Sequence, residues 1–486
     1  MRNLLPAVVL AALAACTGCG ASRVDARPPA PASTAPEAPP PEPPDTFDVR
    51  AIDQYIARQM ASRRFVGLSV AIVKDGEIVL ERGYGKSHLL PDASVQPDTP
   101  FSIGSITKQF VSSVILLLAE EKKLSLDDKV AKYFPDLTRA NDITLYDLMT
   151  HVSGYPDTYP LDFVDEEMKK QVTPDEIIAR YAKRPLDFEP RTRWSYTGTG
   201  YMILGRVIEK VTGKPLGVVL DERIFRPIGM SHTLYLPKEA SPELAWGYTS
   251  FALGPPEPAE PEAHEWNYGA GGIYAPAGDL AKWDIALMSG NVLGPVPYKT
   301  LTTPRRLADG RLTSYGCGIG TGTWGGEEVL EHGGGSSGFV SYNVLIPRTR
   351  SAVVVLSNRD DADPERLASE IVPLLNKTHR PSPLHVAGPD AKAVAGELFA
   401  KIQSGQVDRG RFGPDFNAFL TDEKLQRASA RLRPLGVPTK VDVEGTHERG
   451  GMEQATVRFT FGTTKVKVVM FRSVDGKVQQ FLIYDL

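Results

Sequence analysis

The chain has 486 residues, a formal net charge of −4 at pH 7 and three cysteines. A chain of this length can bury a large apolar core, and its size suggests two or three domains. The near-neutral charge gives no support for nucleic-acid binding, and three cysteines cannot form a disulfide framework. The sequence contains no H-E-x-x-H, no glycine-rich phosphate loop and no internal repeat, so it indicates neither a metal nor a cofactor.

Residues 1–16 have the pattern of a bacterial secretion signal. A charged start precedes an apolar run from Leu4 to Ala15, which is too short to span a membrane. The run ends in Leu13-Ala14-Ala15-Cys16, which resembles a lipobox, the motif whose cysteine is lipidated and becomes the mature N-terminus. We therefore predict export across the inner membrane and a lipid anchor on Cys16 that holds the protein at the periplasm-facing side of an envelope membrane. Cleavage near Ala15 that leaves Cys16 unmodified is the alternative.

Residues 17–46 are rich in proline and alanine and contain few large apolar side chains. Such a segment has too little surface to bury, so it is predicted to be an extended linker between the anchor and the folded part. Cys317 is the only cysteine that follows, and ordinary core burial must therefore hold the fold together.

The first predicted elements of the folded part are a helix and a β-hairpin. Apolar side chains from Ile52 to Met60 recur at helical spacing. Two strand-like runs, Leu68 to Lys74 and Glu77 to Arg82, are joined by Asp75-Gly76, which is typical of a two-residue hairpin turn. The next run, from Ile106 toward Lys122, has an apolar stripe of helical period and is predicted to be a buried central helix.

Further helices separated by proline-rich loops follow, and the chain returns to strands after Val329. Strands are predicted at Phe339 to Ile346 and at Ser351 to Leu356, with a last helix from Pro364 to Asn376. The order of strands, helices and strands favours an α+β domain over residues 47–377. In this domain an antiparallel sheet is flanked by helices, and an all-helical region is inserted.

Residues 378–389 are proline-rich and are predicted to be a linker to a C-terminal domain at residues 390–486. Two amphipathic helices are predicted in that domain, around Val394 to Ile402 and around Leu425 to Leu432. The segments of alternating hydrophobicity that follow predict an antiparallel meander: Ala455–Phe461, Val466–Phe471 and Val478–Tyr484. This small α+β accessory domain has an outline that resembles NTF2-like folds. It contains no constellation typical of catalysis, so a structural or binding role is predicted.

Ser105-Ile106-Thr107-Lys108 is the strongest chemical signal in the chain. It is the only S-x-x-K, and its spacing places both side chains on one face of a helix. A serine is a poor nucleophile at neutral pH unless a base takes its proton. A lysine among apolar side chains loses hydration, which disfavours its charged form. Ser105 is therefore a candidate nucleophile and Lys108 a candidate base, the alternative being a helix-capping serine and a surface lysine.

Other segments follow this motif in order: Leu148-Met149-Thr150-His151-Val152-Ser153-Gly154, Arg193-Trp194-Ser195-Tyr196-Thr197-Gly198-Thr199-Gly200-Tyr201, Gly269-Ala270-Gly271-Gly272 and Glu331-His332-Gly333-Gly334-Gly335. Together with Phe101–Phe110 around Ser105, they resemble the motifs of the serine β-lactamase and penicillin-binding-protein superfamily, in its class C-like branch. That branch contains class C β-lactamases, D-aminopeptidases, D,D-carboxypeptidases and esterases. The resemblance covers about residues 47–376 and implies a β-lactamase/transpeptidase-like fold and a serine hydrolase.

The resemblance also implies a set of site residues: Ser105, Lys108 and Tyr196 as catalytic groups, and Gly335, His332 and Gly334 as oxyanion or substrate-binding groups. Ser105 would attack a carbonyl and form an acyl-enzyme, while Lys108 and Tyr196 share the proton transfers, with the identity of the base left open. The backbone N–H groups of Ser105 and Gly335 would bind the oxyanion. His332 would orient the substrate or relay protons, and no metal or cofactor is needed. His151 is predicted to be structural.

Two positions depart from the superfamily's pattern. The tyrosine motif normally ends in an asparagine whose amide contacts the lysine and the substrate, and Gly198 stands there instead. Thr197 or Thr199 is expected to compensate in part. The third motif has His332 where a lysine would bind a β-lactam carboxylate, and a neutral histidine provides no fixed positive charge. Both departures disfavour a dedicated β-lactamase.

Gly334-Gly335-Ser336-Ser337-Gly338 offers a competing nucleophile, because it matches the G-x-S-x-G elbow of α/β-hydrolases. That elbow requires a helix after the serine, whereas the segment after Gly338 is predicted to be a strand. The sequence therefore favours Ser105 over Ser336.

The expected function is that of a serine hydrolase acting on an ester or on a D-amino-acid-containing peptide or amide. The corresponding enzyme types are an esterase, a D-aminopeptidase and a D,D-carboxypeptidase. The substrate is expected to be a small molecule or a peptide, for example one derived from the cell wall. A true β-lactamase and a non-catalytic envelope binding protein that retains the fold are the alternatives.

Overall fold

The computed structural model describes residues 47–63, 65–159, 161–237, 241–324, 327–375, 389–449, 452–473 and 475–486. The predicted signal peptide, Cys16, the linker at residues 17–46 and residues 378–388 of the second predicted linker lie outside these ranges. In the described part of the chain, no helix is long and apolar enough to cross a lipid bilayer.

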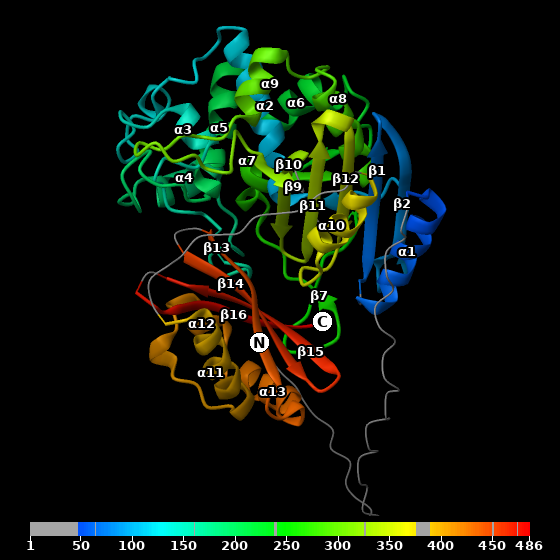
Figure 1. Ribbon diagram of the computed structural model, residues 1–486. Helices are drawn as coiled ribbons and strands as arrows, with labels where there is room; N and C mark the ends of the chain where they lie inside the picture. The colour runs from blue at the N-terminus through cyan, green and yellow to red at the C-terminus, as the bar shows by residue number, and fades with distance from the viewer. Residues whose placement is uncertain are drawn as a thin grey trace, which may run out of the picture. The chain divides into compact units, whose positions relative to one another are not determined.

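A seven-stranded antiparallel sheet forms the centre of the first domain (Figure 1). Its strands in spatial order are β3 (Ala93–Ser94), β2 (Glu77–His88), β1 (Gly67–Lys74), β12 (Ser351–Ser357), β11 (Phe339–Ile346), β10 (Glu327–Ser336) and β9 (Gly320–Trp324). Strand β1 pairs with β12, so that Leu68 lies opposite Ser357. The sheet thus joins strands from the two ends of the domain, and the predicted antiparallel sheet is confirmed.

The β1–β2 hairpin forms where the sequence predicts it. Asp75 and Gly76 both have positive φ, at 55° and 87°, as the two central residues of a type I′ turn require. Strand β1 is buried on both faces from Gly67 to Val73, because it lies inside the sheet and helices cover both sides.

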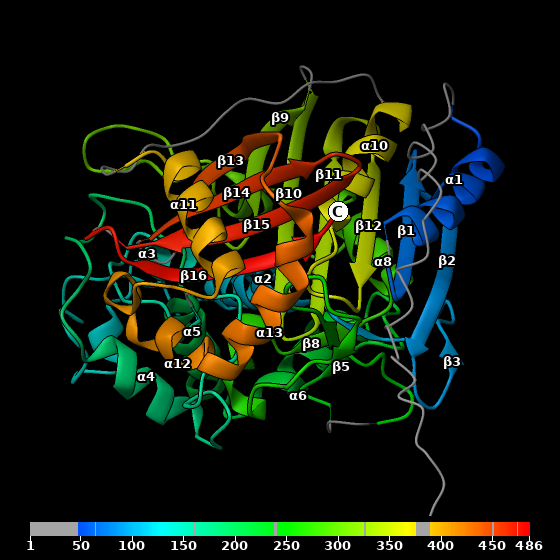
Figure 2. The same cartoon turned by 90° about the horizontal axis from the view of Figure 1, so that it is seen from below.

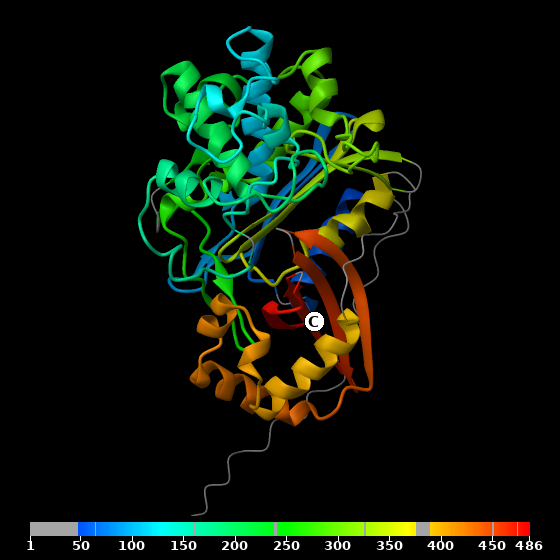
Figure 3. The same cartoon turned by 90° about the vertical axis from the view of Figure 1, so that its left-hand side faces the viewer.

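Helices cover both faces of the sheet (Figures 1 and 3). On one face α1 (Val49–Ser62) and α10 (Pro364–Leu375) share an apolar cluster with Val70 of β1. On the other face Ala71, the next residue of β1, belongs to the cluster of the inserted helical region. Successive side chains of a strand point to opposite faces, so β1 contributes to both halves of the core.

The inserted region is mainly helical. Its α-helices are α2 (Thr107–Glu120), α3 (Leu145–Met149), α4 (Pro174–Ala182), α5 (Gly198–Thr212), α6 (Leu216–Leu220), α7 (Tyr268–Gly271), α8 (Ala277–Met288) and α9 (Pro295–Thr302). Short strands accompany them: β4 (Phe101–Ser102), β5 (Leu234–Tyr235), β6 (Tyr248–Thr249), β7 (Glu257–Pro258) and β8 (Ile273–Ala275). Helix α2 is buried along most of its length, as its apolar stripe predicts.

Two local predictions need correction. Ser105 lies in a 3-10 turn, Gly104–Ile106, that precedes α2, and not inside the helix itself. The turn forms because Gly104 has φ of +50° and redirects the chain out of β4. The predicted strands of this region begin at Phe339, whereas the segment Glu331-His332-Gly333-Gly334-Gly335 lies within an additional strand, β10. Its pairing with β11 supplies the backbone hydrogen bonds that offset the low strand propensity of three glycines.

The C-terminal domain is a separate four-stranded antiparallel sheet with helices on one face (Figure 2). Its elements are α11 (Ala391–Ser404), α12 (Pro414–Phe419), α13 (Asp422–Leu432), β13 (Lys440–Arg449), β14 (Met452–Phe461), β15 (Thr464–Arg472) and β16 (Val478–Asp485). Phe399 of α11 stacks on Phe459 of β14, with ring centroids 4.5 Å apart. The two predicted helices and three predicted strands are confirmed, while α12 and β13 were not predicted.

A buried carboxyl between α8 and β11 provides a test of this packing. Asp284 is fully buried and accepts a hydrogen bond from Asn343 Nδ2 at 2.8 Å. Burial raises the pKa of Asp284 well above its usual range, against the smaller opposing effect of the Asn343 hydrogen bond. Asp284 Oδ2 and Asn343 Oδ1 have no hydrogen-bond partner among the described residues. An amide at position 284 would complete a reciprocal pair with Asn343.

We expect Asp284→Asn to raise the free energy of unfolding by about 1 kcal/mol or more at pH 7. The unfolded Asp284 ionises near pH 4, while burial raises the pKa of the folded one, so its contribution to stability falls as pH rises above about 4. The gain in the variant should therefore grow with pH. Urea unfolding of both proteins at pH 4.5 and 7.5 measures it, and a gain that shrinks with pH contradicts a raised pKa of Asp284.

Candidate active site

Ser105 and Lys108 face each other at the N-terminal end of α2. Lys108 is 2% exposed, and its Nζ donates hydrogen bonds to Ser105 Oγ at 3.0 Å and to the carbonyl oxygen of Ala270 at 2.8 Å. The carbonyl belongs to α7, so a second element fixes the amine against the serine. Ser105 itself is half-buried and reachable by a substrate. The pair has the hydrogen-bond geometry that a nucleophile and its base require.

Aromatic rings enclose the lysine amine. Lys108 Nζ lies 4.8 Å from the ring centroid of Tyr196 and 5.4 Å from that of Tyr201. The Tyr201 hydroxyl donates to the carbonyl oxygen of Met149 at 2.7 Å, which fixes this ring against the last residue of α3. The structure therefore brings together Ser105, Lys108 and Tyr196, which the sequence placed in three separate motifs.

The glycines of β10 allow the strand to lie against the Ser105 turn. A Cβ atom at Gly104 would come within 2.6 Å of the Gly335 backbone nitrogen, and one at Gly334 would come within 2.0 Å of the Ile103 carbonyl oxygen. Any larger residue would separate the two segments. A Cβ atom at Gly335 would meet nothing within 4 Å, so this position borders open space. Gly335 therefore lies against Gly104, the residue that precedes Ser105.

Strand β10 also has an open edge beside Ser105. Strand β9 pairs with it only from Glu327 to Glu331, and the edge from His332 to Ser336 lies beyond this pairing. Among the described residues, no strand pairs with His332 to Ser336 on that side of β10.

His332 is 7% exposed, and both of its ring nitrogens are engaged. Nδ1 lies 2.5 Å from the Gly333 carbonyl oxygen, which can only accept, so Nδ1 carries the proton. The Tyr315 hydroxyl then donates to Nε2 at 2.7 Å. Burial, with the nearby Lys108 charge, lowers the pKa of His332 to about 3. His332 is therefore neutral at pH 7, and Tyr315, which the sequence analysis missed, orients its ring.

This neutral state predicts how His332 affects stability as the pH falls. The unfolded chain protonates His332 near pH 6.5, whereas the folded state resists protonation down to about pH 3. Its contribution is fully present above pH 6.5 and is lost as pH falls towards 3. We expect the stability difference between the wild type and His332→Gln to shift by about 2 kcal/mol against the wild type from pH 7 to pH 5. Urea unfolding at the two pH values measures this shift, and an unchanged difference would contradict the assignment.

His151 and the threonines beside Gly198 support the Tyr196 segment. His151 is fully buried, has φ of +57°, and accepts at Nδ1 a hydrogen bond from the Thr197 backbone N–H at 3.2 Å. The hydroxyls of Thr197 and Thr199 both donate to the Pro156 carbonyl oxygen. Because both hydroxyls are bound to this loop, the structure offers no support for the compensation that was expected of them.

Ser336 has a different environment from Ser105. Ser336 is 8% exposed, and its Oγ donates a hydrogen bond to Ser102 Oγ at 2.7 Å. The chain continues from Ser336 through a turn into strand β11, not into a helix. The context that a G-x-S-x-G elbow requires is therefore absent from this segment, which the structure describes completely.

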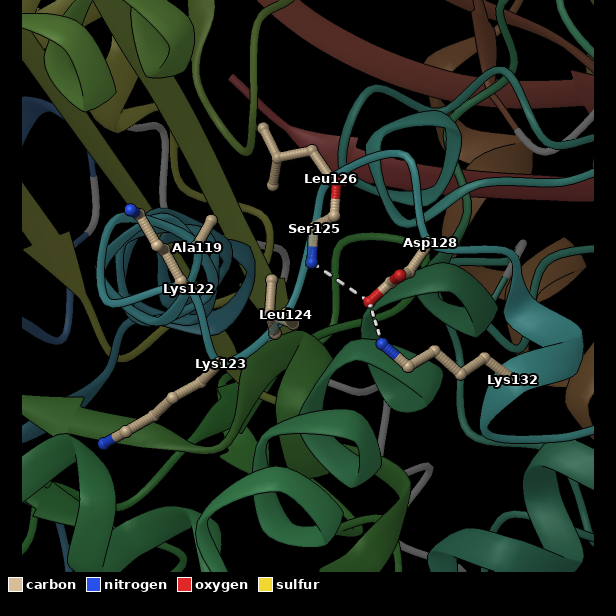
Figure 4. Close-up of a pocket in the computed structure, with 8 residues that line it drawn as sticks. All are labelled: Ala119, Lys122, Lys123, Leu124, Ser125, Leu126, Asp128 and Lys132. Carbon is tan, nitrogen blue, oxygen red and sulfur yellow. Dashed lines mark hydrogen bonds and ion pairs between the residues drawn. The ribbon is translucent and has the colours of Figure 1, made fainter.

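A surface pocket of about 590 Å³ lies at the opposite end of α2 (Figure 4). Its lining residues are Ala119, Lys122, Lys123, Leu124, Ser125, Leu126, Asp128 and Lys132. Asp128 accepts hydrogen bonds there from the Ser125 N–H at 3.0 Å and from Lys132 at 2.7 Å. The lining does not include Ser105, Lys108 or Tyr196.

Among all the residues that the structure describes, no group of three or more His, Cys, Asp or Glu side chains is placed to hold a metal ion.

Residues 52–374 match the sequence model of the Beta-lactamase family. The chain is 29% identical over 335 residues to penicillin-binding protein PbpX of Bacillus subtilis, covering 68% of this chain and 80% of that protein. It is 28% identical over 295 residues to a D-aminopeptidase of Brucella anthropi, covering 60% of this chain and 56% of that protein.

Two solved structures extend the comparison. The D-amino acid amidase of Ochrobactrum anthropi SV3 superposes with a TM-score of 0.59 at 25% identity, covering 68% of this chain and 98% of that chain. The octameric penicillin-binding protein homologue of Pyrococcus abyssi superposes with a TM-score of 0.62 at 22% identity, covering 90% of this chain and 100% of that chain. The second likeness concerns the fold alone.

Proposed function

The chain belongs to the Beta-lactamase family of serine hydrolases, and we propose from this that it cleaves an amide or ester bond through an acyl-enzyme on Ser105. The observation that carries the proposal is the 3.0 Å hydrogen bond from Lys108 Nζ to Ser105 Oγ. Ala270 holds the amine in this position through its carbonyl oxygen. Burial of Lys108 supports a role as a base, because loss of hydration disfavours the charged amine.

Acylation begins when the Ser105 hydroxyl proton passes to Lys108 or Tyr196. The Oγ lone pair forms a bond to the substrate carbonyl carbon, and the π electrons of that carbonyl move to its oxygen. The backbone N–H groups of Ser105 and Gly335 receive the oxyanion, and the close approach of Gly335 to Gly104, the residue before Ser105, supports this role. The intermediate collapses, the leaving amine or alkoxide takes the proton back, and the acyl group remains on Ser105. Water repeats the same steps to release the acid.

The substrate class we favour is an amide, peptide or ester with a D-amino acid at the cleaved bond. The chain is similar to a D-aminopeptidase and to a D-amino acid amidase, which supports this class. The open edge of β10 next to Ser105 suits an extended peptide or amide. The neutral His332 supplies no positive charge for a carboxylate, which argues against a dedicated β-lactamase.

Two assays on the wild-type protein test the proposal. A fluorophosphonate probe should form a covalent adduct on Ser105, found by mass spectrometry of the peptide. Turnover should be faster for D-alanine p-nitroanilide than for its L enantiomer or for the β-lactam nitrocefin. Absence of any adduct and of any turnover favours a binding protein that retains the fold. Fast turnover of nitrocefin alone favours a β-lactamase.

We also propose that Cys16 is lipidated and anchors the exported protein at the cell envelope. The basis is the segment Leu13-Ala14-Ala15-Cys16 at the end of a short apolar run. Mass spectrometry of the N-terminal peptide should show a diacylglyceryl group on Cys16. A mature protein that begins near Cys16 without lipid contradicts the anchor but leaves the export signal intact.

A further inference from the structure

Position 198 has no room for a side chain, although its backbone would accept one. Gly198 is the first residue of α5, two residues after Tyr196, and its φ lies outside the left-handed region that favours glycine. A Cβ atom there would come within 2.4 Å of Thr158 Oγ1 and within 3.6 Å of Ala270 Cβ. Ala270 is the residue whose carbonyl oxygen binds Lys108 Nζ. The Thr158 hydroxyl therefore occupies the place of a side chain at position 198, beside the residue that holds the lysine.

The loop before Thr158 is bound to the start of α5. Asp157 Oδ1 accepts hydrogen bonds from the backbone N–H of Gly198 at 2.6 Å and from that of Tyr159 at 3.3 Å. A carboxylate at a helix N-terminus is stabilised by the helix dipole and by the unpaired N–H groups there. Thr158 is 2% exposed, so its side chain is held in one place between the loop and the helix.

The other end of the same loop is bound to the C-terminal domain. Gln480 of β16 is fully buried, and its amide forms two hydrogen bonds with Asp162: Oε1 accepts from the backbone N–H, and Nε2 donates to Oδ2 at 2.9 Å. Leu161 packs in a small apolar cluster with Met452 and Phe471 of the C-terminal sheet. The loop that carries Thr158 is thus fixed from both sides.

We propose that Thr158 is a specificity-determining residue of the Ser105 site, and that the C-terminal domain positions it through Gln480. Its hydroxyl hydrogen-bonds the amide group in the acyl part of a D-amino-acid substrate, at the place that a side chain on residue 198 would otherwise fill. The inference rests on the proposed function of Ser105. It assigns a role in substrate selection to a loop and a domain that lie outside the Ser105, Lys108 and Tyr196 motifs.

Two esters with the same leaving group isolate this contact. The p-nitrophenyl ester of N-acetyl-D-alanine has an amide in its acyl part, whereas p-nitrophenyl acetate has none. Thr158→Val keeps the shape and removes the hydroxyl, and it should lower kcat/KM roughly tenfold for the first ester and less than about twofold for the second. Thr158→Ser should retain activity on both. Equal losses on both esters, or none, would overturn the inference.

A second pair of variants tests the shared space. Gly198→Ser alone should lower kcat/KM for the amide-containing ester, because its side chain collides with Thr158. Adding Thr158→Ala should restore activity, since a hydroxyl at position 198 then replaces the one removed from position 158. If Gly198→Ser alone is fully active, or if the double variant is no better than Gly198→Ser, the two residues do not share one place.

Gln480→Met tests the positioning by the C-terminal domain. It removes both hydrogen bonds to Asp162 at similar volume, and it should reduce kcat/KM selectively for the amide-containing ester. Gln479→Met is the matched control, because Gln479 bonds only to Ser473 in the same domain among the described residues. If Gln480→Met and Gln479→Met have the same effect on kcat/KM for the two esters, the positioning role is contradicted.

Fluorophosphonate labelling separates this inference from the proposed function. The wild type and all six variants should be labelled on Ser105 at similar rates, because the probe has no amide in its reacting group. Normal labelling with unchanged ester selectivity in the Thr158 variants overturns only the inference. A wild type that is neither labelled nor active on either ester overturns the proposed function, and the inference with it.

Discussion

Ser105→Ala is expected to lower kcat on any substrate of this protein by about 10⁴- to 10⁶-fold and to abolish labelling by a fluorophosphonate. The variant removes the oxygen atom on which the proposed acyl-enzyme forms. The fold should be unaffected, because Ser105 is half-buried and its side chain contacts Lys108 at the site surface. Steady-state kinetics and intact-protein mass spectrometry after exposure to the probe measure both effects.

Ser336→Ala is the matched control for this prediction. Ser336 is the competing serine of the G-x-S-x-G segment, and among the described residues its hydroxyl donates a hydrogen bond to Ser102. The control variant should retain labelling and most of the activity. Loss of activity in Ser336→Ala together with a fully active Ser105→Ala would reverse the assignment of the nucleophile.

Asp147→Ala is expected to lower the free energy of unfolding by about 3–5 kcal/mol. Asp147 is fully buried in α3, where Oδ2 accepts from Arg191 at 2.6 Å and Oδ1 accepts from Arg305 at 2.7 Å. Its carboxylate also accepts from the Thr144 backbone N–H and completes the capping box of α3. Removal of the carboxylate leaves the two guanidinium groups without their shared partner, which accounts for the size of the loss.

Asp142→Ala provides the comparison for this loss. Asp142 forms an exposed ion pair with Arg139, and water and salt screen such pairs so that they contribute little to stability. Urea or thermal unfolding of both variants at pH 7 measures the contrast. A loss at Asp147 no larger than that at Asp142 would show that the buried network does not hold the loop between α3 and α5.

Several elements of the fold are predictable because local pattern and tertiary environment agree. The β1–β2 hairpin follows from its Asp-Gly turn, and α2 follows from an apolar stripe that the domain core then buries. Strand β13 could not be predicted in the same way. Its sequence from Lys440 to Arg449 is largely charged and polar, and it forms an edge strand because β14 offers hydrogen bonds on that side.

The residues of the candidate site also include some that the sequence predicts and some that it does not. Ser105, Lys108 and Tyr196 carry side chains whose chemistry is recognisable within short segments, and a contact between Ser105 and Lys108 follows from their spacing. Tyr315 lies in no such segment, and Ala270 lies in the motif Gly269-Ala270-Gly271-Gly272, for which the sequence indicated no role. Tyr315 acts through a hydroxyl on His332 and Ala270 through a backbone carbonyl, and neither contact follows from the local sequence.

Local chemistry therefore indicated the family, the order of the main elements and the candidate nucleophile, because these depend on side chains close together in the chain. The tertiary structure alone decided how Lys108 is held and which residue lies beside Gly198. Thr158 and Gly198 are distant in the sequence, and the close approach of their atoms is a property of packed surfaces. Such contacts depend on how closely separate segments of the chain pack together. Neither the period of apolar residues nor the spacing of motifs predicts this packing.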